Sequence, residues 1–297
     1  MSSRGWILFL AMSIIWGIPY LMIKIAVEGV SVPVLVFTRV AVGAVVLLPL
    51  ALSRQTWTII RNHWPALLGF AFFEIIAAWW LLSDAERHLT SSMTGLLIAA
   101  SPIVAAVLDR FSGGERLGVK RILGLAIGIC GVAVLAGPHI GGSTWPVIEV
   151  LLVAVCYAIA PLIAARYLAD VPALPMTAVC LGFAALVYAA PAAATWPDEM
   201  PSTRVLVALG GLAVICTALA FIVFFALIRE VGAARALVFT YINPAVALAA
   251  GVIVLNEPLT PWNIAALALI LAGCVLATRR PKPQASEIEI ETQAAPR

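Results

Sequence analysis

Long apolar runs, separated by short polar connections, follow one another along almost the whole chain. The ten runs are Trp6–Val27, Val34–Leu52, Pro65–Leu82, Ser91–Leu108, Val119–Leu135, Trp145–Leu168, Pro172–Ala190, Val205–Ile228, Ala233–Val254 and Trp262–Ala277. A helix needs about 20 residues to cross roughly 30 Å of hydrocarbon, and most of the runs reach that length. The alternating pattern of membrane strands is absent. We therefore predict an all-α integral membrane protein with about ten transmembrane helices.

One stretch of the chain occurs twice. Residues 101–135 and 243–277 align without a gap, so that Pro102 falls on Pro244 at an offset of 142 positions (244 − 102). Pro19 falls on Pro161 at the same offset (161 − 19). A register kept over this length indicates two copies of one structural unit. We expect a first repeat of five spans at 5–136, a linker at 137–144, a second repeat of five spans at 145–278 and a disordered cytoplasmic tail at 279–297.

The composition agrees with a bilayer environment. Of the 297 residues, 63% are hydrophobic and only 11% are charged, whereas about 25% of a soluble domain is charged. The partners expected are therefore the lipid bilayer and a small-molecule substrate. Nucleic acid is excluded, because no stripe of Lys and Arg is present. The five cysteines lie in apolar runs without metal-ligand spacing and are expected to be small buried hydrophobes, so no metal and no cofactor are implied.

The positive charges are distributed unevenly between the two sides of the predicted bundle. If the N-terminus is cytoplasmic, fourteen of the 18 Lys and Arg residues lie inside, as the positive-inside rule requires. Both termini are then cytoplasmic. Five spans is an odd number, so the two copies must be inverted relative to each other, which is the plan of many secondary transporters. Six tryptophans at span ends are expected to be interfacial anchors, namely Trp6, Trp57, Trp64, Trp145, Trp196 and Trp262.

The chain resembles the drug/metabolite transporter superfamily, in its ten-helix form with two tandem EamA-type repeats. The residues that carry the resemblance are Trp16–Gly17, Ser101–Pro102, Gly114–Glu115–Arg116–Leu117, Gly124, Gly131, Asn243–Pro244, Asn256–Glu257–Pro258–Leu259 and Gly273. The second copy departs from the first at Trp16–Gly17, where it has Tyr157–Ala158 one residue out of register.

What the resemblance implies is exchange or export of small metabolites across a plasma (inner) membrane. It also implies a central cavity lined by the first, third, fourth, sixth, eighth and ninth spans. The fifth and tenth spans would then be peripheral, and we expect a homodimer to form through them.

Prolines at matching places in the two copies indicate where the site lies. Pro19, Pro102, Pro161 and Pro244 are expected to break their helices, and such breaks are tolerated at depth when they line a cavity. The alternative is a packing kink without a ligand. Four polar residues near the breaks are candidate pathway residues, and they are Thr94, Ser101, Thr240 and Asn243. Each of them could instead bond a neighbouring helix.

The first span carries an aromatic, a phenol and an ammonium group on one face. Trp16, Tyr20 and Lys24 are spaced by four residues and would grip an amphipathic anion or an aromatic amino acid. Lys24 could instead snorkel and pair with Glu28, and Arg39 in the second span has a similar ambiguity. Trp79 and Tyr157 complete the set of candidate binding residues.

Glu74 is the candidate proton-coupling residue, because it lies nine residues into its run and its counterpart in the second copy is Cys216. An ionisable group at membrane depth is a functional hypothesis by default, and desolvation favours the neutral carboxyl. The alternative is a structural bond to Arg39 or to a backbone carbonyl. Glu115 and Glu257, in loops before the peripheral spans, are expected to be structural caps at helix starts.

These observations predict a secondary transporter, an exporter or exchanger that works by alternating access and is a candidate for proton coupling. The few deep charges favour a neutral, zwitterionic or amphipathic metabolite such as an amino acid over nucleotide sugars or phosphates. The alternative readings are an intramembrane enzyme, or a membrane scaffold or sensor. No G-x-S-x-G, H-E-x-x-H or P-loop motif is present in the sequence, so the chain is not expected to be an enzyme.

Overall fold

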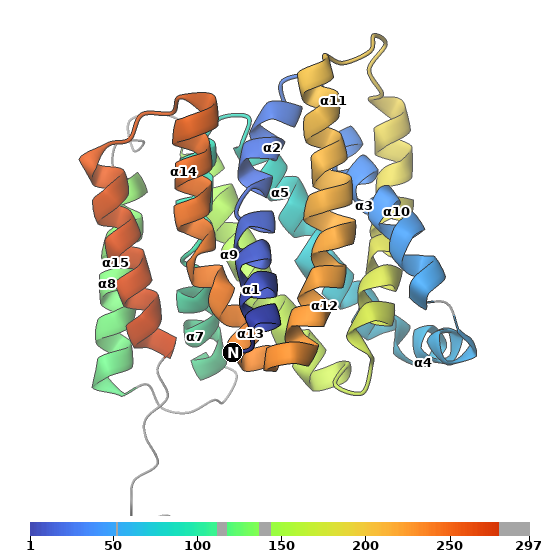
Figure 1. Ribbon diagram of the computed structural model, residues 1–297, viewed down its shortest axis with the longest axis horizontal. Helices are drawn as coiled ribbons and strands as arrows, with labels where there is room; N and C mark the ends of the chain where they lie inside the picture. Colours follow the sequence, from blue (N-terminus) through green and yellow to red (C-terminus); the bar gives the residue numbers. More distant parts are fainter. Residues whose placement is uncertain (52, 112–117, 137–143, 279–297) are drawn as a thin grey trace, which may run out of the picture.

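The computed structural model describes residues 1–51, 53–111, 118–136 and 144–278, and these residues form helices without a strand. Seven helical stretches among them are long and apolar enough to cross a membrane, and shorter apolar helices accompany them. The chain is thus an all-α, multi-pass membrane protein of about ten helices, as predicted (Figure 1). Three expectations fall outside the described residues: the cap at Glu115, the tail at 279–297 and all of the linker except Thr144.

The described residues of the first copy form nine helical elements. They are α1 (Ser3–Ile15), α2 (Pro19–Ala26), α3 (Val32–Ala51), α4 (Arg54–Ala71), the π-helical η1 (Phe72–Ile76), α5 (Ala77–Ala85), α6 (Ser91–Ile98), α7 (Ser101–Phe111) and α8 (Val119–Ala136). The elements of the second copy are α9 (Trp145–Tyr167), α10 (Ala173–Ala194), α11 (Thr203–Gly210), the π-helical η3 (Gly211–Leu219), α12 (Ala220–Val231), α13 (Ala233–Ala236), the 3₁₀ element η4 (Leu237–Tyr241), α14 (Asn243–Leu255) and α15 (Pro261–Thr278).

Equivalent spans of the two copies run in opposite directions through the bundle. In Figure 1, the third span of the first copy starts with α4 on the side of the N-terminus and continues upward into α5. Its counterpart starts with α11 on the far side and descends into α12. The N-terminus and the end of α15 lie on the same side of the bundle. This arrangement is that of two inverted five-span repeats.

Three of the predicted spans are interrupted in the middle. The breaks lie between α1 and α2, between α6 and α7, and between η4 and α14. Pro19, Pro102 and Pro244 take the first or second position of the helix that follows each break, where a missing N–H leaves no hydrogen bond unmade. Pro161 is different, because it lies inside the continuous helix α9. The prediction of a helix break at Pro161 is therefore wrong, although Pro19 and Pro161 match in sequence.

The third span of each copy contains a π-helical segment. The first of them, η1, maps by the 142-residue offset onto positions 214–218, which lie inside η3. π-helical turns are rare and are often found at functional sites. The hydropathy pattern predicted that the third span begins at Pro65. The helix begins at Arg54 and the candidate membrane span at Trp57. Its first turns carry polar residues, such as Arg61 and Asn62, that hide them from a hydropathy window.

The fifth and tenth spans form a pair at one edge of the bundle, where α8 and α15 lie side by side (Figure 1). Glycines make this contact close, since a Cβ atom at Gly273 would lie 2.5 Å from the backbone nitrogen of Gly128. Small residues at such interfaces let two backbones approach each other. Cys130 on α8 is exposed, contrary to the expectation that all five cysteines are buried.

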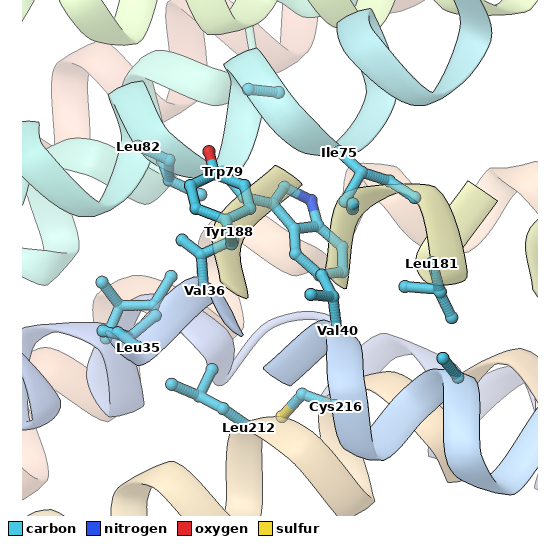
Figure 2. Close-up of a cluster of buried hydrophobic side chains, with 14 of the residues drawn as sticks. Leu35, Val36, Val40, Ile75, Trp79, Leu82, Leu181, Tyr188, Leu212 and Cys216 are labelled. Atoms are coloured by element: carbon cyan, nitrogen blue, oxygen red, sulfur yellow. The ribbon is translucent and has the colours of Figure 1, made fainter. Parts of the chain in front are cut away.

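A large buried apolar cluster takes residues from both copies and joins them. Figure 2 shows Val36 and Val40 of α3 between Trp79 of α5 on one side and Leu212 of η3 on the other. The six tryptophans expected at the interfaces are all more than half exposed, as lipid-facing anchors would be. Trp80 is partly exposed and stacks on Tyr188, with ring centroids 6.0 Å apart.

Candidate functional site

A cavity of about 340 Å³ lies between the two copies. It brings together most of the residues that the sequence singled out, which are Trp16, Pro19, Tyr20, Arg39, Glu74, Trp79, Ser101, Pro102, Tyr157, Pro161, Thr240, Asn243 and Pro244. The six spans named by the family resemblance all contribute to its wall. The second span adds Arg39 and the tenth span adds Leu271, so the tenth span is not wholly peripheral.

The polar residues at the helix breaks bond to the carbonyls around them. Ser101 Oγ donates to the carbonyl of Ile98 at 2.6 Å, and Thr240 Oγ1 donates to that of Leu237 at 2.7 Å. The Asn243 amide, oriented by its hydrogen-bond network, donates to the carbonyls of Phe239 and Ser13, both at 3.2 Å. In this conformation the three side chains stabilise the breaks, and each also faces the cavity.

Arg39 is held in place by both copies of the repeat. Its Nε donates to Thr217 Oγ1 of η3 at 2.9 Å, and its guanidinium carbon lies 3.6 Å from the ring centroid of Trp79. Thr217 in turn donates to the carbonyl of Leu212 at 2.8 Å, across the π-helical turn. The side chain is buried and lines the cavity, so it does not snorkel to the membrane surface. Within the described residues it has no acidic partner in ion-pair contact.

Glu74 lies on η1, is half-buried and also lines the cavity. No hydrogen bond or ion pair of its carboxyl group is found with any described residue, so the alternative of a structural bond to Arg39 is not seen. Tyr157 of α9 interacts electrostatically with both Glu74 and Arg39. The cavity therefore presents an acid and a guanidinium that do not pair with each other, and a phenol that interacts with both.

An aromatic wall completes the cavity. Trp16 packs on Phe221, Phe224 and Phe239, with ring centroids 5.8, 5.0 and 5.4 Å away. Phe221 lines the cavity together with Trp16. Such rings offer apolar area and a quadrupole that attracts cations. The cavity can therefore hold an amphipathic molecule that carries both charges.

Two predicted site residues lie away from the cavity. Lys24 neither lines it nor pairs with Glu28, because its Nζ donates to the backbone carbonyls of Glu86 and Leu89, both at 2.7 Å. Carbonyls at the end of a helix attract a cation. Thr94 is fully buried, and its Oγ1 donates to the carbonyl of Thr90 at 3.1 Å. Neither residue lines the cavity in this conformation, and a place in the pathway stays a prediction for both.

Glu257 caps a helix, but one in the other copy. Its Oε1 accepts from Ser91 N at 2.8 Å and from Ser91 Oγ at 3.0 Å, and its Oε2 accepts from Ser92 N at 2.9 Å. The first N–H groups of α6 are thereby satisfied. A cap on the following span, α15, was the expectation, so the target of the cap is corrected. Gly251 leaves room for this carboxylate, because a Cβ atom there would overlap it.

The sequence analysis missed Thr217 as a positioning residue. A signal was available, since Thr217 is the one polar residue with a side chain near the middle of an otherwise apolar run and it adjoins Cys216, the counterpart of Glu74. Cys216 also lines the cavity. Phe221 and Leu271 could not be separated from other apolar positions by pattern, because lining and packing residues look alike in such runs.

The cavity is closed at one end. Tyr20, Trp79 and Leu82 line that end and are buried. At the other end, the lining residues of η4 are partly exposed, and Leu237 is half exposed. That end is directed toward α13 and the side of the bundle that holds the N-terminus (Figure 1). In this conformation the end of the cavity at η4 is more exposed than the end at Tyr20, Trp79 and Leu82.

Comparison with known proteins supplies a family. The model of the EamA-like transporter family matches the chain twice, over residues 3–137 and 144–279. The "Uncharacterized transporter YvbV" of Bacillus subtilis is 26% identical, over 99% of this chain and 98% of the relative. The "Uncharacterized inner membrane transporter YedA" of Escherichia coli K12 is 27% identical, over 90% of this chain and 88% of the relative.

Two further similarities bear on substrate and fold. A "Probable terminal-alkyne amino-acid exporter" of Streptantibioticus cattleyicolor is 26% identical, over 94% of this chain and 95% of the relative. A solved crystal structure superposes with a TM-score of 0.65 at 21% identity, and the match covers 94% of this chain and 98% of the other. At that identity the superposition bears on the fold alone.

Proposed function

The chain belongs to the EamA-like transporter family, and we propose that it exports or exchanges an amino acid or a similar zwitterionic, amphipathic metabolite by alternating access. Family membership and the names of the relatives make the chain a transporter and not an enzyme. The reading as an intramembrane enzyme is thereby set aside.

One observation carries the substrate proposal: the cavity holds one guanidinium and one carboxyl that do not pair with each other. Among the residues that line it, Arg39 is the single cation and Glu74 the single acid. A buried charge without a partner is costly, so each favours an opposite charge from a ligand. A substrate carboxylate can accept hydrogen bonds from Arg39, and a substrate ammonium suits Glu74 and the aromatic faces.

The balance of charge also disfavours other substrate classes. A sugar phosphate or a nucleotide brings two or more negative charges and requires several Arg or Lys residues, whereas this cavity offers one. An uncharged hydrocarbon would leave both charges unsatisfied. The aromatic wall around Trp16 suits an apolar side chain of the substrate. The printed name of the Streptantibioticus relative, an amino-acid exporter, is consistent with this choice.

Glu74 is the proposed coupling residue, because it faces the cavity and no described residue satisfies it. A carboxyl group in the transport path can carry a proton in one direction while substrate moves in the other. The proposal places the protein in the plasma (inner) membrane with both termini in the cytoplasm, on the strength of the Lys and Arg distribution. A homodimer through α8 and α15 remains a proposal.

Counterflow in proteoliposomes tests the function. Vesicles preloaded with unlabelled amino acids of different side chains are diluted into labelled amino acid, and protein-free liposomes serve as the control. We expect transient accumulation of label for one or more amphipathic amino acids, and none for sugar phosphates or nucleotides. Counterflow of a phosphorylated compound without any counterflow of an amino acid would overturn the substrate class, and an absence of counterflow altogether would overturn amino acid exchange.

A further inference from the structure

The closed end of the cavity is tied together by one lysine. Tyr20 and Leu82 line that end, and Lys24 and Glu86 follow them by four residues each, about one helical turn further along α2 and α5. There, Lys24 Nζ donates to the carbonyls of Glu86 and Leu89, both at 2.7 Å. These two bonds connect α2 to the segment that joins α5 and α6, directly beyond the cavity.

The carboxyl group of Glu86 has no partner at this place. The residue is fully buried, and neither Oε1 nor Oε2 makes a hydrogen bond with any described residue. The hydroxyl of Ser83, one turn earlier on α5, is also buried and without a partner. Lys24 bonds to the backbone of Glu86 and not to its carboxylate, since no ion pair between the two side chains is found in the described ranges.

Charged groups from three other parts of the chain interact electrostatically with Glu86. Lys24 comes from α2, Arg39 from α3, and Glu257 from the connection between α14 and α15. Tyr20 of α2 also interacts with it. Glu86 follows the last residue of its membrane span. Burial raises the pKa of the Glu86 carboxyl well above its usual value; Lys24 acts against this rise and Glu257 adds to it.

We propose that Glu86 is a proton-binding site that controls the closed end of the cavity through Lys24. With Glu86 neutral, the ammonium of Lys24 stays on the two carbonyls and the end is closed. With Glu86 ionised, the buried carboxylate draws the ammonium off the carbonyls of Glu86 and Leu89 into an ion pair. The direct tie of α2 to the backbone of the segment between α5 and α6 is then replaced by a longer link through two side chains, which lets the two parts separate. The proposal rests on the alternating-access function above and assigns it a second titrating carboxyl, outside the cavity and separate from Glu74.

The direction of the pH effect follows from linkage. The closed state holds Glu86 in an environment that favours its neutral form, so this state binds the proton more tightly than a state in which the carboxylate has a partner. Its population is therefore full at low pH and falls as the pH rises through the raised pKa of Glu86. One proton can change the ratio of closed to open molecules by at most about tenfold for each pH unit.

Distance measurements between spin labels test the proposal without a substrate. Glu28 and His88 are exposed on the two parts that Lys24 joins, and both are replaced by labelled cysteines in a chain whose five native cysteines are replaced. Double electron–electron resonance in nanodiscs is then recorded from about pH 5 to about pH 9, a range that brackets the values documented for buried carboxyls.

We expect a short distance at low pH and a growing population of longer distances as the pH rises. Glu86→Gln keeps the volume of the side chain and is expected to hold the short distance at every pH, whereas Glu86→Asp keeps a titrating group and retains the response. Lys24→Met removes the tie and is expected to show the long distance throughout. Glu199→Gln, an exposed acid between α10 and α11, is the control and follows the parent chain.

The proposal is overturned if the parent chain shows one distance at all pH values, or if Glu86→Gln follows the parent curve. The readout needs neither flux nor substrate, so its failure is distinguishable from failure of the proposed function. If the distances change with pH as expected but no amino acid counterflow is seen, the role of Glu86 is supported and the substrate proposal is overturned. If amino acids are exchanged but the distance does not depend on pH, only the proposal for Glu86 is overturned.

Discussion

The guanidinium carbon of Arg39 lies 3.6 Å from the ring centroid of Trp79. The stack joins α3 to α5, and the hydrogen bond from Nε to Thr217 adds η3 of the other copy. Both contacts fix the plane of the guanidinium, and the side chain lines the cavity. An arginine held in this way is preorganised for a carboxylate, because little freedom is lost when the ligand binds.

The first prediction concerns proton coupling. Glu74→Gln keeps the shape of the side chain and removes its proton exchange, so folding and membrane insertion are expected to be unchanged. Substrate accumulation driven by a pH jump should fall to the level of protein-free liposomes, while downhill counterflow persists. Flux measured in proteoliposomes checks this, with Glu199→Gln as a matched control. Accumulation equal to that of the parent chain would remove Glu74 from the coupling mechanism.

The contact between α8 and α15 makes a prediction about stability. A methyl group at Gly273 meets the backbone of Gly128 at 2.5 Å, and backbone atoms cannot move aside as a flexible side chain can. Overpacking of this kind costs about 1–3 kcal/mol, so Gly273→Ala should lower the thermal unfolding temperature in detergent. Gly210→Ala is the control, because nothing lies within 4 Å of its added methyl group. Equal unfolding temperatures for the two variants would contradict the close packing.

The cap that Glu257 forms on α6 is tested by a neutral replacement. Glu257→Gln keeps one acceptor oxygen but loses the charge and one of the two oxygens that accept from Ser91 and Ser92. Loss of a cap costs about 0.5–2 kcal/mol, so the unfolding temperature should fall and expression should decrease. Counterflow per folded molecule should change little. A variant with parental stability and impaired exchange would instead place Glu257 in the mechanism.

Orientation in the membrane is tested by labelling. The prediction is that the loop around Ser83–Leu89 faces outward; within it the structure exposes Arg87 and His88. In a chain without other cysteines, His88→Cys should react with a membrane-impermeant maleimide added to intact cells. Arg4→Cys, near the exposed N-terminus, should react only with a permeant reagent. The reverse pattern would invert the assigned orientation.

Most of the architecture could be predicted, because it depends on periodicity and on the repeat. The ten apolar runs predict the helices. Because each repeat has five spans, an odd number, the two repeats must have opposite orientations in the membrane. The start of α4 was hidden because Arg61 and Asn62 lower its mean hydropathy. The place of Pro161 inside a continuous helix could not be predicted either. The sequence alone does not distinguish a proline at the start of a helix from one inside it.

The site residues that could be predicted most readily are those with a charged side chain inside an apolar run. Glu74 and Arg39 stand out because charges are few in the runs, and both line the cavity. Lys24 could not be placed, since its carbonyl partners are backbone atoms 62 and 65 residues away and leave no signal in residue types. The reach of Glu257 to α6 depends on how the two copies pack, which neither copy encodes alone.

The most direct test of the account compares ligand binding to the parent chain and to Arg39→Gln by titration calorimetry in detergent. The ligands are a transported amino acid and the amine that results from its decarboxylation, and Arg204→Gln, on the exposed start of α11, is the control. Hydrogen bonds to a charged group contribute about 1.5–3 kcal/mol, so the Kd of the amino acid should rise about 10–100-fold in Arg39→Gln. Binding of the amine should be weak and equal in both proteins. An amino acid that binds Arg39→Gln as tightly as the parent chain would contradict the central claim that Arg39 receives the substrate carboxylate.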